Sequence, residues 1–114
     1  MRTDLGMEPG KIASQAGHAF LGAFLSPSNN PEVLQEYHSD FPKSPGTKIC
    51  LKCPTLPALL QAEAEAQEEG IPIFKVIDSG CPNFFGGRPV ITALGIGPCT
   101  KEQVQHITGK FRLL

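Results

Sequence analysis

The sequence predicts an α/β fold, in which helices pack against a sheet, and three observations lead to this prediction. A strand, a helix and a second strand follow one another over residues 47–77, in the order of a βαβ unit. An alanine-rich helix precedes this unit, and its small side chains allow close approach to a sheet. A further strand and a capped helix follow from residue 90 onward. The length of 114 residues fits one domain, which we expect to span residues 1–114.

The first helix is predicted over residues 11–25, after a turn at residues 6–10. Apolar side chains recur there at helical spacing and should face inward: Ile12, Ala16, Ala19 and Ala23. The stretch at residues 26–30 breaks this helix. The pair Asn30-Pro31 then supplies a cap and a first-turn proline for a short helix over residues 31–38.

Residues 47–53 are predicted as a strand that ends at Pro54. Thr55 can cap a helix that runs to about Glu69, and Gly70 can end it. Residues 71–77 form the next strand. Because a helix joins these two strands, we expect them to be parallel, with a right-handed crossover.

The last third of the chain predicts a loop, a strand and a helix. The loop is rich in Gly, Pro and Phe, and the strand covers residues 90–96. Thr100 and Gln103 have the spacing of a capping box for a helix to about Thr108.

Composition restricts the function classes. The net charge is −1, so contact with RNA would need a local basic patch, and a DNA-binding protein is not expected. No apolar run approaches the ~18 residues of a membrane span, and the N-terminus lacks a secretory signal. We therefore expect a cytoplasmic protein without a membrane partner.

The four cysteines include a CxxC pair, Cys50 and Cys53. On a strand these two side chains would point to opposite faces, whereas chelation needs them on one side of a turn. Cys81 and Cys99 form no second pair. We expect no metal site.

Lys11, Gln15 and His18 are spaced by four and three residues, so they share one face of the first helix. A lysine in a first turn is unfavourable, because the helix dipole is already positive there. Together with free N–H groups, its ammonium would suit an anion. The alternative is an exposed lysine that happens to begin a helix.

Asp78 stands at the carboxyl end of a strand, where ligands collect in open α/β sheets. A carboxylate there can act as a base or orient a water molecule. It can equally open a turn before Gly80. In the loop that follows, Phe84 and Phe85 either anchor the loop in the core or offer a stacking surface for a base.

An ordered set of motifs resembles the type 2 peptidyl-tRNA hydrolases, the archaeal and eukaryotic form. The motifs cover essentially the whole chain: RTDLGM from residue 2, GKIASQAGHA from 10, TKICLKCP from 47, VIDSG from 76, ITALGIGP from 91 and TGKFRLL from 108.

This resemblance implies a three-layer α/β/α sandwich with a four-stranded mixed sheet, and a homodimer. It implies hydrolysis of the ester that joins a peptide to the 3′ ribose of tRNA, without a metal or other cofactor. The family also carries an apolar strand before the RTDLG motif, and this chain begins inside that motif. The first strand therefore looks truncated: either the domain tolerates a very short first strand, or residues that precede it are absent from this sequence. In the second case, the truncation would leave an open slot that a partner could fill.

Carried over by position, the resemblance makes Lys11, Asp78 and Thr92 the catalytic candidates, with Gln15 and His18 as binding residues. Our hypothesis is that Asp78 orients or deprotonates a water molecule. Lys11 would stabilise the oxyanion and keep the carboxylate ionised, and Thr92 would supply a hydroxyl hydrogen bond.

The loop after Asp78 departs from the family. Where the family continues with a basic residue, threonine and glutamine, this chain has Cys81, Pro82 and Asn83, and about two additional residues before Arg88. Pro82 offers neither a hydroxyl nor an N–H group. We keep Asn83 and Arg88 as substrate-binding candidates. The alternatives are a non-catalytic relative that serves as a binding or interaction module, and a hydrolase with a changed substrate.

Overall fold

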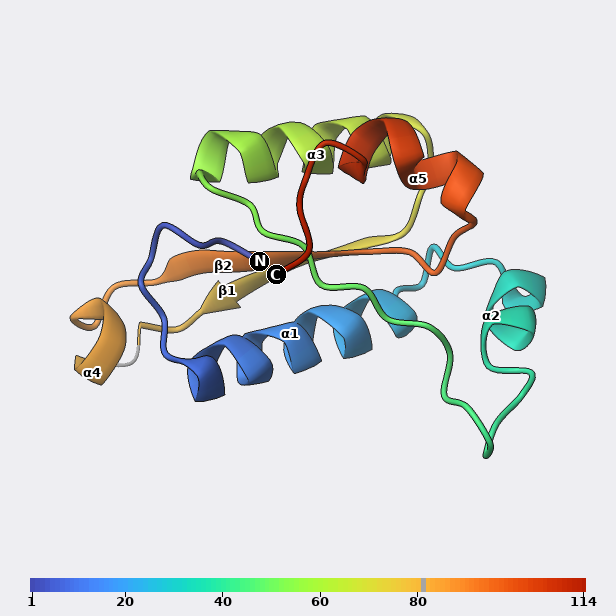
Figure 1. The fold of residues 1–114 in the computed structure, drawn as a ribbon, viewed down its shortest axis with the longest axis horizontal. Coiled ribbons are helices and arrows are strands. Elements are labelled where there is room, and N and C mark those ends of the chain that lie inside the picture. Colours follow the sequence, from blue (N-terminus) through green and yellow to red (C-terminus); the bar gives the residue numbers. More distant parts are fainter. Residues whose placement is uncertain (81) are drawn as a thin grey trace.

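The computed structural model describes residues 1–80 and 82–114, apart from the side chains at positions 83 and 84. It is an α/β protein in which α1 (Pro9–Phe24) covers one face of a small sheet (Figure 1). Two helices cover the opposite face: α3 (Leu56–Glu68) and α5 (Lys101–Thr108). Two shorter helices, α2 (Pro31–Tyr37) and α4 (Pro82–Phe85), lie at opposite ends of the molecule.

The predicted helix starts are confirmed by their caps. The Asn30 side chain accepts a hydrogen bond from the backbone of Glu32, and that of Thr55 accepts one from the backbone of Ala58. Thr100 and Gln103 form the reciprocal capping box at the start of α5. Helix α1 begins two residues earlier than predicted, at Pro9, because proline is well suited to the first helical position.

The sheet differs from the prediction. Its two strands, β1 (Ile73–Asp78) and β2 (Val90–Ile96), are antiparallel, with an irregularity between Val76 and Ile77. The loop after β1 folds back, so the next segment in the chain becomes its neighbour. Residues 47–53, the first strand of the predicted βαβ unit, form no extended strand and make isolated bridges, Leu51 with Leu113 and Cys53 with Arg2. They do not pair with β1, and the parallel direction of the two segments stays a prediction.

The N-terminus lies between β2 and residues 50–53. The backbone N–H of Arg2 donates to the Thr92 carbonyl at 2.9 Å, on the edge of β2 that faces away from β1. On its other side, the Cys53 N–H donates to the Met1 carbonyl at 2.7 Å. Residues 1–2 thus extend the hydrogen-bonding pattern of the sheet beyond β2 to one further chain segment.

Close packing fixes the distance between α1 and the sheet. Ala19 of α1 is buried against Val76 and Ala93, one from each strand. A Cβ atom at Gly95 would lie only 2.2 Å from the Ala19 carbonyl oxygen, so this strand position requires glycine. The face of α1 that carries Lys11 and Gln15 is thereby held next to the end of β1.

Two hollows flank the sheet. The first, of about 700 Å³, runs along α1 and β1. The second, of about 660 Å³, lies between β2 and residues 47–53, and mainly apolar side chains line it, including Phe20, Ile49, Leu51 and Leu94. No helix in the described part of the chain is long and apolar enough to cross a membrane.

Candidate active site

An ion pair joins α1 to β1. The Lys11 ammonium lies 2.5 Å from Oδ2 of Asp78. Lys11 comes from the first turn of α1, and Asp78 is the last residue of β1. The two side chains are only 13% and 10% exposed. Because water screens such a pair poorly, the attraction is stronger than between surface charges.

The other carboxylate oxygen of Asp78 is held by the turn that follows. Oδ1 accepts the backbone N–H of Gly80 at 2.9 Å. Gly80 has a φ of 95°, and a Cβ atom there would lie 2.6 Å from the backbone of Arg88. Only glycine allows this turn to pass so close to the far end of the loop. The carboxylate is thus fixed through both of its oxygens.

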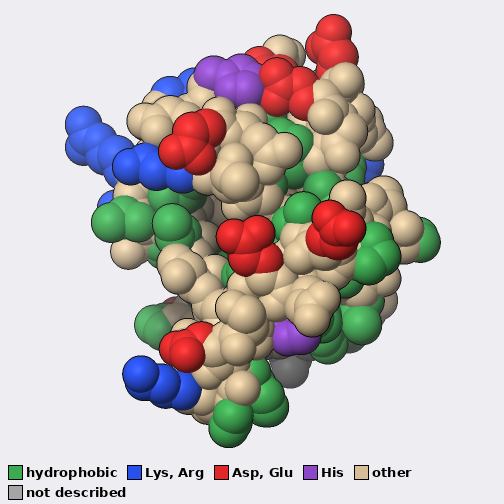
Figure 2. Space-filling model, turned by 90° about the vertical axis from the view of Figure 1, so that its right-hand side faces the viewer, with side chains coloured by type: hydrophobic (Ala, Val, Ile, Leu, Met, Phe, Trp, Pro, Cys, Tyr) green, Lys and Arg blue, Asp and Glu red, His purple; other side chains and the backbone are tan. Residues whose placement is uncertain are grey.

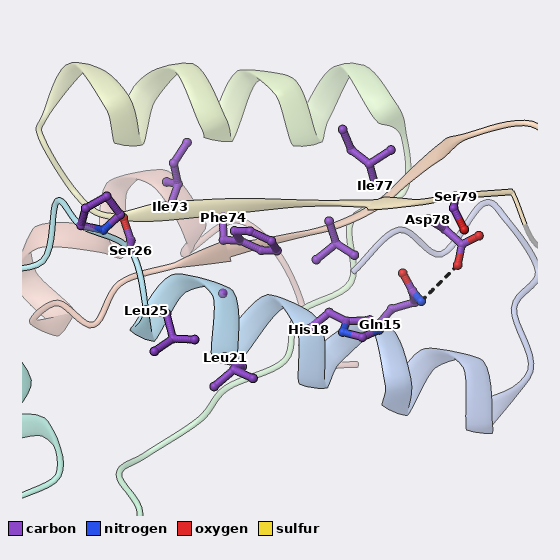
Figure 3. A pocket seen from close by; sticks show the side chains of 13 residues that line it. Gln15, His18, Leu21, Leu25, Ser26, Ile73, Phe74, Ile77, Asp78 and Ser79 are labelled. Carbon is purple, nitrogen blue, oxygen red and sulfur yellow. Dashed lines mark hydrogen bonds between the residues drawn. The ribbon is translucent and has the colours of Figure 1, made fainter.

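Gln15 and Thr92 support the ion pair from the core side. The Thr92 hydroxyl donates to Oε1 of the Gln15 side-chain amide at 2.5 Å. The Gln15 amide nitrogen then donates to Oδ2 of Asp78 at 3.4 Å (Figure 3). Gln15 is 2% exposed and Thr92 is fully buried. A buried hydrogen bond of this kind fixes which end of the amide faces the carboxylate.

Phe85 approaches the pair from α4. The Lys11 nitrogen lies 5.6 Å from the centre of the Phe85 ring, within the range of a cation–π interaction. The half-buried Phe85 ring thus lies beside the charged pair, and the choice between a core anchor and a stacking surface for a base stays open. The side chain of Phe84 lies outside the described residues.

The remaining candidates have different positions. His18 is exposed on α1, one turn beyond Gln15, and lines the first hollow (Figure 3). Arg88 is exposed, and its backbone N–H donates to the carbonyl of Phe85. The side chain of Asn83 lies outside the described residues, so its place in the site is open.

Sequence reasoning offered the turn from Asp78 to Gly80 as an alternative to a reactive carboxylate, whereas the structure shows both features together, and it left the role of Phe85 undecided. Gly80 had a local signal, because a glycine two residues after an aspartate is typical of a turn in which the carboxylate caps a backbone N–H. No local sequence pattern indicated the role of Phe85, because its contact with Lys11 joins segments that are far apart in the chain.

The arrangement can support chemistry on an electrophilic carbonyl group. A carboxylate at the end of a groove can orient or deprotonate water, and an adjacent ammonium can stabilise a developing oxyanion. Among the described residues, no three His, Cys, Asp or Glu side chains form a group that could hold a metal ion.

The charge distribution does not mark a broad nucleic-acid surface on the face seen in Figure 2. Acidic side chains are scattered over the middle of that face, and the basic ones gather near its left margin. The phosphates of an RNA would meet mixed charges on this face.

Comparison with known proteins gives a consistent result. The chain matches the family described as "Peptidyl-tRNA hydrolase PTH2" over residues 1–114. It is 36% identical to a peptidyl-tRNA hydrolase of Methanopyrus kandleri, over the whole chain and 93% of the relative. A peptidyl-tRNA hydrolase of Methanocaldococcus jannaschii is 34% identical, with 95% of its length covered. A mouse protein, "Peptidyl-tRNA hydrolase 2, mitochondrial", is 32% identical over 99% of the chain and 60% of the relative.

Proposed function

Because this chain belongs to the peptidyl-tRNA hydrolase PTH2 family, we propose that it hydrolyses the ester bond between peptide and tRNA in peptidyl-tRNA. The activity is that of a carboxylic ester hydrolase that recycles tRNA. The observation that carries the proposal is the buried Lys11–Asp78 pair at the end of an open groove. A non-catalytic binding module would not need a charged pair held in this way.

In the proposed reaction, Asp78 accepts a proton from water while the water oxygen attacks the ester carbonyl carbon. Lys11 stabilises the negative charge that develops on the carbonyl oxygen. The bond to the 3′ oxygen of the ribose then breaks, and that oxygen takes up the proton that Asp78 had accepted. The new carboxylic acid of the peptide loses its remaining proton to solvent. The products are a peptide carboxylate and a tRNA with a free 3′ hydroxyl. No cofactor is needed in this scheme.

Gln15 and Thr92 act in this scheme by positioning. Since the Thr92 hydroxyl donates to Gln15 and Gln15 donates to Asp78, Thr92 reaches the carboxylate through the amide. The hydroxyl hydrogen bond expected from Thr92 is thus made to Gln15, and we propose positioning roles for both residues in place of the catalytic and substrate-binding roles expected from the sequence. We assign His18, Asn83 and Arg88 to substrate binding, with Arg88 supplying positive charge for the RNA.

The sheet of the proposed enzyme has four strands in a three-layer sandwich. Residues 1–3 would form the third strand and residues 47–53 the fourth, which is supported by the hydrogen bonds from Arg2 to Thr92 and from Cys53 to Met1. Residues 1–114 would act as one domain. Slow amide exchange at Arg2 and Cys53 would support this sheet, and exchange as fast as in the loop at residues 42–46 would contradict it.

Two further properties follow from the family resemblance and remain proposals. A homodimer is supported by large apolar side chains on the surface, such as Phe41 at 67% and Leu113 at 71% exposed. Sedimentation of the purified protein would test it, and a single species at the monomer mass would contradict it. A cytoplasmic location is supported by the substrate, which ribosomes release there.

The direct test of the function is incubation of the purified chain with a peptidyl-tRNA carrying a blocked, labelled peptide. We expect release of the peptide and a tRNA that can be charged again by its synthetase. An aminoacyl-tRNA with a free amino group is the control for substrate choice. Binding of peptidyl-tRNA without release would instead support the binding module.

A further inference from the structure

The first hollow is an exposed groove with a mainly apolar lining. Four large hydrophobic side chains along it are exposed to solvent: Leu21 (59%), Leu25 (66%), Phe74 (42%) and Ile77 (56%). They lie along α1 and β1, and the groove ends at Asp78 and Gln15 (Figure 3). Contiguous apolar surface next to a polar site is typical of a place where an apolar ligand binds.

The charges along the groove do not suit the tRNA part of the proposed substrate. Among the 13 described residues that line it, Asp78 is the one acidic residue and there is no Lys or Arg. A tRNA end carries a phosphate at every nucleotide and needs cations or N–H donors. Peptidyl-tRNA has one other part, the peptide, and that part matches the apolar walls.

We propose that this groove binds the peptide portion of peptidyl-tRNA as an extended strand along the outer edge of β1. The inference rests on the proposed function and adds to it the part of the substrate that the groove recognises. β1 pairs with β2 on one side, and over residues 73–77 no backbone hydrogen bond to another described segment occupies its other side. Such an edge offers N–H and C=O groups to an extended peptide.

The position of Asp78 fixes the direction and the length of the bound peptide. The ester carbonyl, at the carboxyl end of the peptide, must lie at Asp78, which is the carboxyl end of β1. The peptide therefore runs parallel to β1, with its amino end toward Leu25. β1 has six residues, and a strand rises by about 3.3 Å per residue, so about five or six peptide residues can lie in the groove.

The side-chain pattern of the groove adds specificity. In Figure 3, Phe74 and Asp78 point from β1 toward α1, whereas Ile73 and Ile77 point to the other face of the strand. A bound peptide would likewise turn every second side chain toward Leu21, Phe74 and the α1 surface. Gly22 leaves room for the Phe74 ring, because a Cβ atom at that position would lie 2.2 Å from the ring.

The test compares substrates that differ only in the peptide. The same tRNA carries blocked peptides of one, three, five and eight residues, in an apolar and a serine-rich series. We expect kcat/KM to rise about tenfold from one to five apolar residues, mainly through KM, with no further gain at eight residues. The serine-rich series should gain much less.

Substitutions in the groove test whether the dependence of kcat/KM on peptide length arises there. Leu21→Asn combined with Leu25→Asn should abolish the gain from peptide length and leave hydrolysis of the one-residue substrate unchanged. Leu60→Asn is the matched control, since Leu60 is an exposed leucine on α3, away from the groove. It should keep the full dependence on peptide length.

Two outcomes overturn the inference. The first is equal kcat/KM for all peptide lengths, in which case the proposed function still stands, because the substrates are cleaved. The second is an unchanged length dependence in the Leu21/Leu25 variant. If the parent protein is also a dimer that dissociates in this variant, the second outcome would make the groove an interface between two copies. Failure to cleave every substrate would contradict the proposed function itself.

Discussion

The two hollows beside the sheet have nearly the same volume, about 700 and 660 Å³, but ionisable groups in them have different surroundings. In the first, the Asp78 carboxylate has an ammonium, an amide and a backbone N–H as partners. In the second, burial lowers the pKa of the Met1 amino group and raises the pKa of the Cys99 thiol. Burial thus favours the neutral forms of these two groups, whereas the end of the first hollow holds a charged pair.

This difference shows why volume alone does not identify a reactive site. Burial disfavours a charged group unless partners compensate for the lost water. The first hollow supplies those partners from both α1 and the end of β1, and the second offers apolar walls for packing. Changes that remove the partners should therefore reduce activity, and equivalent changes at the second hollow should not.

The largest effect is expected for Lys11→Met. This change removes the charge that would stabilise the oxyanion and leaves a side chain of similar length. We expect turnover of peptidyl-tRNA to fall by about 100-fold or more. Lys101→Met is the matched control, because Lys101 also lies in the first turn of a helix and lines the second hollow. Equal activity of the two variants would remove the distinction between the hollows.

Gly80→Ala should have the next largest effect. The new methyl group would meet the backbone of Arg88, in a conformation that L-residues rarely adopt, so the turn that binds Oδ1 of Asp78 must shift. We expect a loss of at least tenfold in kcat, since misplacement of a reacting group is costly. Gly70→Ala controls for backbone strain, because Gly70 also has a positive φ but faces open space. If both variants lose the same activity, strain alone explains the result.

Thr92→Val should have a moderate effect on both stability and activity. The substitution preserves the shape of the side chain but removes the hydroxyl that donates to Oε1 of Gln15. This oxygen is then buried without its hydrogen-bond donor. The free energy of unfolding should fall by about 1–3 kcal/mol, measured by urea titration, and kcat should fall about tenfold. Thr108→Val is the control, since that hydroxyl bonds within α5. An unchanged kcat for Thr92→Val would show that the Gln15 orientation does not matter.

The smallest effect concerns the second hollow. Because burial raises the pKa of the Cys99 thiol, this thiol stays protonated to higher pH than an ordinary cysteine and should react slowly with iodoacetamide at pH 8. Mass spectrometry of the peptide that contains Cys99 measures the rate from pH 7 to pH 10. The unfolded chain in guanidinium chloride is the reference. A rate for the folded protein that equals this reference would contradict the apolar character of the second hollow.

The sequence predicts the local parts of this fold well. Asn30, Thr55 and Thr100 act as caps because capping depends on residues three positions apart or fewer. Strand pairing depends on contacts between distant segments, and for this reason the sequence did not show which segments are neighbours in the sheet. Residues 47–53 have the composition of a strand, but their neighbours are Met1–Thr3 and the C-terminal tail rather than β1.

The sequence indicated most residues of the candidate site, but it did not indicate the hydrogen bonds and contacts that join them. Helical spacing placed Lys11 and Gln15 on one face, and the strand end marked Asp78. The link from Thr92 through Gln15 to Asp78 joins residues 63 and 77 positions apart, which no local pattern shows. Phe85 likewise reaches Lys11 across most of the chain.

The most direct test of the central claim is single-turnover hydrolysis of a labelled peptidyl-tRNA by Asp78→Asn and by the parent protein. Asparagine keeps the shape of the side chain but cannot accept the proton from water. We predict a rate at least about 100-fold lower for Asp78→Asn. Asp40→Asn, a change at an exposed loop residue, should match the parent. Cleavage by Asp78→Asn at the parent rate would contradict the assignment of this pair as the catalytic centre.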